Sequence, residues 1–116
     1  MQHTDEWRRP FDLCGFHFIS ILQAEIVLMF LNYRGEVKLI TTKMGYKNRV
    51  AIDNKLGRFR RDNGLNNNIH MVMHLIGHTG FWTRLDDYLK VHSDQLKIAK
   101  QQVELRRRAF TKRRKS

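Results

Sequence analysis

The tripeptide Asp62-Asn63-Gly64 constrains the fold more than any other feature of the sequence, because Asn and Gly tolerate the positive φ angles of tight turns. Before it, residues 57–61 place basic side chains at alternate positions. After it, in residues 67–75, every second side chain is apolar (Ile69, Met71, Met73 and Leu75). Two alternating runs about a Gly-containing turn predict a β-hairpin with one apolar and one polar face.

A similar pattern predicts a first hairpin upstream. Residues 26–32 are rich in β-formers, Tyr33-Arg34-Gly35 offers a turn, and residues 36–42 alternate. Helical spacing predicts helices at 10–24, 45–56, 80–90 and 94–108. The expected fold class is therefore α+β, with a four-stranded antiparallel sheet that has helices on one face and a polar, basic opposite face. The expected organisation is a flexible N-terminus (1–9), one domain (10–105) and a basic tail (106–116).

The charge balance indicates the partners. The chain has 22 Lys and Arg against 11 Asp and Glu, a net charge of +11, which favours polyanions. Nucleic acid is the first candidate and an anionic membrane surface the second. The one apolar stretch long enough for a membrane span, 16–33, is interrupted by His17, Ser20, Gln23 and Glu25, so no span is predicted. Cys14 is the lone cysteine, which fits an intracellular, reducing compartment.

Two segments resemble a known family. Residues 56–64, Leu-Gly-Arg-Phe-Arg-Arg-Asp-Asn-Gly, and residues 81–97, from Phe-Trp-Thr-Arg-Leu to Gln-Leu-Lys, resemble the LAGLIDADG homing endonucleases of the single-motif type. The resemblance implies an αββαββα half-unit whose sheet sits in the DNA major groove. It further implies Mg²⁺-dependent cleavage of double-stranded DNA by a homodimer, or a decayed relative of such an enzyme. An organelle (mitochondrion or chloroplast) or phage origin is the corresponding expectation.

The family's motif helix can be placed in two ways. If residues 18–26 form it, Glu25 falls on the metal-binding carboxylate, while Ser20 and Ile26 replace the motif's glycines. If residues 13–16 open it, no acid follows, and the chain has no nuclease activity. Carboxylates suit Mg²⁺ and its role in phosphodiester hydrolysis. Under the first placement the catalytic candidates are Glu25, Lys43 and His92; otherwise Glu25 is a helix-end carboxylate paired with a nearby Lys or Arg.

Nucleic-acid contacts follow from the predicted strand faces. Side chains expected to point to base edges in the major groove are Lys38, Arg58, Arg60, Asn68 and His70. Basic residues expected to contact phosphates are Arg34, Arg61, Arg113 and Arg114. The alternative for each is a solvated surface charge. The alternative function is a non-catalytic protein that binds intron RNA or ribosomal RNA.

Three histidines recur at every fourth position: His70, His74 and His78. On a helix they would line one face and could bind zinc. On the predicted strand, His70 and His74 would lie about 13 Å apart, too far for one ion. The strand prediction therefore argues against a metal site here.

Overall fold

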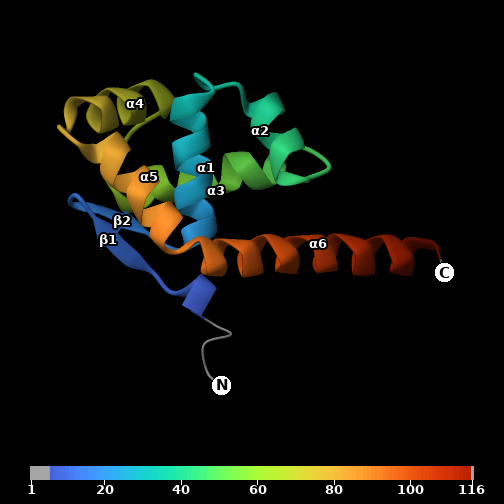
Figure 1. Cartoon of the computed structure of the whole chain (residues 1–116). Helices are drawn as coiled ribbons and strands as arrows, with labels where there is room; N and C mark the ends of the chain where they lie inside the picture. Colours follow the sequence, from blue (N-terminus) through green and yellow to red (C-terminus); the bar gives the residue numbers. More distant parts are fainter. Residues whose placement is uncertain (1–5, 116) are drawn as a thin grey trace.

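The computed structural model describes the backbone of residues 6–115 and the side chains of residues 6–108. Helices dominate this part of the chain (Figure 1). The elements in order are β1 (Phe11–Leu13), β2 (Phe16–Phe18), α1 (Ile21–Asn32), α2 (Val37–Met44), α3 (Val50–Asp62), α4 (Asn68–Gly77), α5 (Phe81–Val91) and α6 (Ser93–Lys115). None of the described helices is both long and apolar enough to cross a membrane.

Helix α1 is the centre of the molecule. The side chain of Ser20 accepts a hydrogen bond from the Gln23 N–H and so caps the start of the helix. Nine of its twelve residues are buried, on every side of the helix. This is expected of a helix that is apolar all round. Helices α2, α3, α5 and α6 all pack against it (Figure 1).

The predicted α+β class, with an αββαββα order and a four-stranded antiparallel sheet, is wrong. The described residues form one two-stranded antiparallel sheet, β1–β2, in a segment predicted to be helical. Cys14 and Gly15 have φ of 54° and 81°, which gives the two-residue turn that a tight hairpin requires. Phe11 and Phe18 face each other across the hairpin, and their rings stack at 5.1 Å. The apolar run that suggested a buried helix is therefore a strand pair that supplies aromatic rings to the core.

The predicted first hairpin is two helices, because α1 continues to Asn32 and α2 follows. The turn signal at Arg34 and Gly35 is real, since both residues have positive φ. It ends a helix instead of reversing a strand: the Gly35 N–H donates to the Phe30 carbonyl at 2.9 Å, five residues back. The prediction failed because a positive-φ glycine serves both kinds of turn.

The predicted second hairpin is also two helices, α3 and α4. Helix α3 continues through Gly57 and buries Ile52, Leu56 and Phe59, which recur at helical spacing. Gly64, with φ of 69°, ends it, and the Leu65 N–H donates to the Arg60 carbonyl at 2.8 Å. Residues 57–75 therefore contain no strand, and no sheet face presents their basic side chains.

Helices expected at 80–90 and 94–108 are confirmed as α5 and α6. Their apolar stripes bury Phe81, Leu85, Leu89 and Ala99. Helix α6 runs to Lys115, beyond the expected boundary of the basic tail, and its second half projects past the rest of the molecule (Figure 1).

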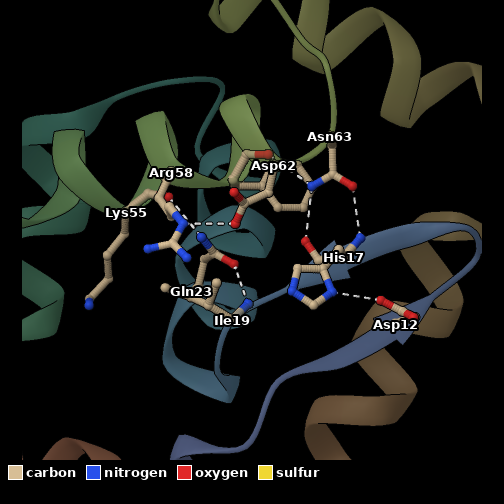
Figure 2. Close-up of polar contacts among 9 residues, drawn as sticks. Asp12, His17, Ile19, Gln23, Lys55, Arg58, Asp62 and Asn63 are labelled. Atoms are coloured by element: carbon tan, nitrogen blue, oxygen red, sulfur yellow. Dashed lines mark hydrogen bonds and ion pairs between the residues drawn. The ribbon is translucent and has the colours of Figure 1, made fainter.

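Two amide side chains connect the hairpin, α1 and α3 (Figure 2). Asn63 accepts from the His17 N–H at 2.8 Å and donates to the His17 carbonyl at 2.9 Å, as a neighbouring strand would. Gln23, fully buried, accepts from the Ile19 N–H at 2.8 Å and donates to the Lys55 carbonyl at 3.1 Å. Because buried polar groups are costly when unpaired, these bonds fix the position of α3 relative to the core.

Candidate nucleic-acid interface

The three predicted catalytic residues have separate structural partners. Glu25, on α1, forms an ion pair with Lys100 of α6 at 3.0 Å, and its side chain is 15% exposed. This pairing is the alternative role that the sequence allowed for Glu25. The Lys43 ammonium lies 5.7 Å from the centre of the Tyr33 ring.

The third residue, His92, lies between α5 and α6. Its Nδ1 is 2.9 Å from the Tyr88 carbonyl, and its ring stacks on Tyr88 at 4.0 Å. Glu25, Lys43 and His92 thus have their contacts with different side chains on α1, α2 and the α5–α6 junction. Among the described residues, no group of three or more His, Cys, Asp or Glu side chains could hold a metal ion.

The histidine spacing argument fails with the strand on which it depended. His70 and His74 lie on helix α4, one turn apart, with ring centroids separated by 4.7 Å. His70 is engaged locally, because its Nδ1 accepts from the Asn66 N–H at 2.9 Å.

The residues predicted to contact nucleic acid are spread over several elements and share no single face. Arg34 and Asn68 line a cavity beside α4 together with apolar side chains. His70 lies on α4 too. Arg58, Arg60 and Arg61 lie on α3, and Lys38 is exposed on α2. Arg113 and Arg114 belong to α6, but their side chains lie outside the described ones.

Helix α3 presents a continuous polar face. Because the helix buries Ile52, Leu56 and Phe59 on one side, the residues that it exposes fall on the other side at helical spacing. They are Val50, Asn54, Arg58, Arg61 and Asp62. Lys47, Asn48 and Arg49 precede the helix and are exposed as well. Arg60 is only half-buried and bends toward the Asn66 carbonyl at 3.5 Å, so it belongs less to this face.

The sequence analysis did not identify the residues at the N-terminal end of this face. The residues it did not single out are Lys47, Asn48, Arg49, Val50 and Asn54. The prediction ended a helix at Gly57 and began a strand there, so Arg58 and Arg61 were assigned to a different element. The spacing of Ile52, Leu56 and Phe59 across the glycine is the signal that could have joined the two halves.

The connection between α2 and α3 is short and shaped by a glycine. Gly45 has φ of 78° and closes α2, with the Tyr46 N–H donating to the Thr41 carbonyl at 3.1 Å. Residues 45–48 and the N-cap Arg49 then lead into α3. Helix α1 packs against both helices, and α2 and α3 pack against each other. The result is a compact unit of three helices, and α3 also packs against α4 and β2.

The segment that carries this face is cationic. Residues 45–65 contain six Lys and Arg against two Asp. Both aspartates pair within α3: Asp53 with Arg49 at 2.9 Å, and Asp62 with Arg58 at 2.9 Å. The hydrogen bond and charge of Asp53 raise the pKa of Arg49. With the acids engaged, Lys47 and Arg61 are left to set the charge that this face offers to a partner.

Comparison of the chain with protein-family models, with curated proteins and with solved structures found no match.

Proposed function

We propose that the chain binds double-stranded DNA, with α2 and α3 acting as a helix-turn-helix and α3 as the helix that enters the major groove. In such motifs two helices are joined by a short turn that often contains glycine, and the N-terminal part of the second helix contacts base edges. The exposed polar face of α3 is the observation that supports this proposal best. The four-stranded surface expected from the sequence plays no part in it.

The chemistry of the face fits duplex DNA. Asn48 and Asn54 are of the type that pairs with adenine through two hydrogen bonds, and Arg pairs similarly with guanine. Basic side chains beside them suit phosphates, which give affinity without sequence choice. The major groove of B-DNA admits an α-helix, whereas that of A-form RNA is too deep and narrow for side chains to read. Duplex DNA is therefore favoured over duplex RNA.

Arg61 gives the sharpest test, because it is exposed on α3 and its side chain forms no hydrogen bond or ion pair with the described residues. For Arg61→Gln we expect affinity for duplex DNA to fall about tenfold, the size of one good Arg contact. The slope of log affinity against log salt should decrease by about one if the contact is to phosphate. Fluorescence anisotropy with labelled duplexes over a salt series measures both quantities.

A matched control removes the same charge elsewhere. Arg84 is exposed on α5, which packs against α1, α4 and α6, and its guanidinium makes one long contact, to the Cys14 Sγ at 4.0 Å. Arg84→Gln should leave affinity nearly unchanged, because exposed charges are screened beyond about 10 Å at moderate salt. Equal losses for the two variants, or single-stranded RNA bound more tightly than duplex DNA with no effect of Arg61→Gln, would overturn the proposal. Circular dichroism checks that each variant is folded.

DNA cleavage and homodimer formation stay predictions. A Glu25→Gln variant tests the first: a catalytic role requires loss of Mg²⁺-dependent cleavage with DNA binding retained. The ion pair with Lys100 leads us to expect instead a modest loss of stability, with DNA binding unchanged.

A further inference from the structure

A cavity of about 720 Å³ lies where five parts of the chain meet. The N-terminal segment contributes Trp7, the turn before α3 contributes Tyr46 and Lys47, α3 contributes Lys55, and α6 contributes Arg106. The start of α1 completes the lining. Small-molecule sites have volumes of about 300 to 1,000 Å³ and combine apolar walls with a few placed polar groups. This cavity has that size and that composition.

The charge around the cavity is of one sign. Arg8, Lys47, Lys55 and Arg106 all line it, and none of the described residues in its lining is acidic. Lys55 is the most enclosed of them. Burial, and then the nearby charge of Arg106, lower the pKa of the Lys55 ammonium. Two cations are thus held near each other, and one of them is partly desolvated. An anion between them would offset both their mutual repulsion and the desolvation of Lys55.

The rest of the lining is apolar and includes two aromatic rings. Trp7 and Tyr46 face the cavity together with aliphatic side chains such as Val103. The Arg8 guanidinium lies 4.7 Å from the centre of the Trp7 ring, so a cation borders the aromatic part of the wall. Burial raises the pKa of the Tyr46 hydroxyl, which keeps it protonated and able to donate a hydrogen bond.

We propose that this cavity binds a small aromatic anion, with the acidic group beside Lys55 and Arg106 and the ring against the apolar wall that contains Trp7 and Tyr46. An inorganic anion would pair with the basic side chains and leave the apolar wall uncovered. A neutral aromatic molecule would cover the wall and leave the basic side chains unpaired. The site adjoins the exposed face of α3 and shares Lys47 and Asn48 with it. Binding of the anion does not depend on the proposed DNA function.

The experiment is a calorimetric titration of the full chain, without nucleic acid, using three matched probes: 2-naphthalenesulfonate, neutral 2-naphthol and inorganic sulfate. We expect the sulfonate to bind more tightly than either of the others. Lys55→Met and Arg106→Gln should each weaken it about tenfold, the loss of one charge-assisted contact. Lys97→Gln, which removes an exposed α6 charge outside the lining, should leave binding unchanged.

A second measurement uses the stability of the apo protein. Because Lys55→Met removes a partly buried charge, it should keep or raise the melting temperature without probe, yet lose most of the increase that the sulfonate gives the parent chain. If Lys55→Met fails to fold, Arg106→Gln decides alone, since Arg106 is exposed. Unchanged sulfonate affinity in the Arg106 variant, or 2-naphthol bound as tightly as the sulfonate, would overturn the proposal.

Discussion

Gly57→Ala should stabilise the protein, although Gly57 is buried and lies in a segment that the sequence predicted to be a strand. The residue is in the interior of α3, where glycine costs about 1 kcal/mol relative to alanine. A Cβ built there would meet only the Arg60 and Arg61 side-chain nitrogens, both at 3.6 Å, which is ordinary van der Waals contact. No strain therefore offsets the gain in helix propensity.

The expected change is an increase of about 1 kcal/mol in the free energy of unfolding, or about 4 °C in melting temperature for a chain of this size. Urea unfolding followed by circular dichroism measures the first, and a thermal scan the second. Gly45→Ala is the matched control. A new Cβ at Gly45 would meet nothing within 4 Å, but the φ of 78° should cost about 1 kcal/mol. A Gly57→Ala variant less stable than the parent would refute the continuous α3 helix.

Three further predictions concern polar contacts. Asn63→Ala should lower the free energy of unfolding by about 2 kcal/mol, measured by urea unfolding, because it leaves two backbone groups of the hairpin unpaired. A double-mutant cycle of Glu25→Ala and Lys100→Ala should give a coupling of about 0.5 to 1 kcal/mol, reflecting a partly exposed pair. Two following arginines lower the pKa of Glu104 below its ordinary 4.5. The stabilisation that the ionised Glu104 gives the folded state is complete above pH 4.5 and is lost as the pH falls through the lower folded pKa. Glu104→Gln should therefore reduce the dependence of the melting temperature on acid pH.

The sequence predicted where the chain changes direction better than what it does between those points. Gly35 and Gly64 were recognised as turns, and both have positive φ. They end helices, because the same backbone conformation closes a helix and reverses a hairpin. The packing of α1 against its neighbours decides whether such a turn ends a helix or reverses a strand. A local sequence pattern does not contain information about that packing.

Alternation misled the prediction for α4 in a specific way. When every second residue is apolar, residues four apart are apolar as well. Residues four apart lie on one face of a helix, so an alternating pattern is also compatible with a helix. Met71 and Leu75 are the buried residues of α4, whereas Ile69 and Met73, which complete the alternation, are 74% and 68% exposed. The strand pattern was therefore partly a helix pattern, and partly an apolar surface.

The sequence identified some of the residues of the candidate interface, but it did not predict how they are arranged. Arg58 and Arg61 were identified from their charge and spacing, and they do lie on one exposed face. Asn48 and Asn54 were missed, because their helix was thought to end at Gly57. The cavity was not predictable at all, since Trp7, Lys55 and Arg106 come together only through the tertiary fold.

The side chain of Asn63 also links the chemical lifetime of the protein to its conformational stability. In an Asn-Gly sequence the glycine backbone nitrogen readily attacks the carbonyl carbon of the asparagine side chain and expels ammonia. The resulting cyclic succinimide is then opened by water to give aspartate or isoaspartate. While the hairpin is docked, three hydrogen bonds restrain that amide, so deamidation has to wait for the hairpin to open. Once formed, the carboxylate cannot donate to the His17 carbonyl. Each opening of the hairpin therefore allows a deamidation that prevents the hairpin from docking fully again. The rate of this chemical damage depends on how often the hairpin opens.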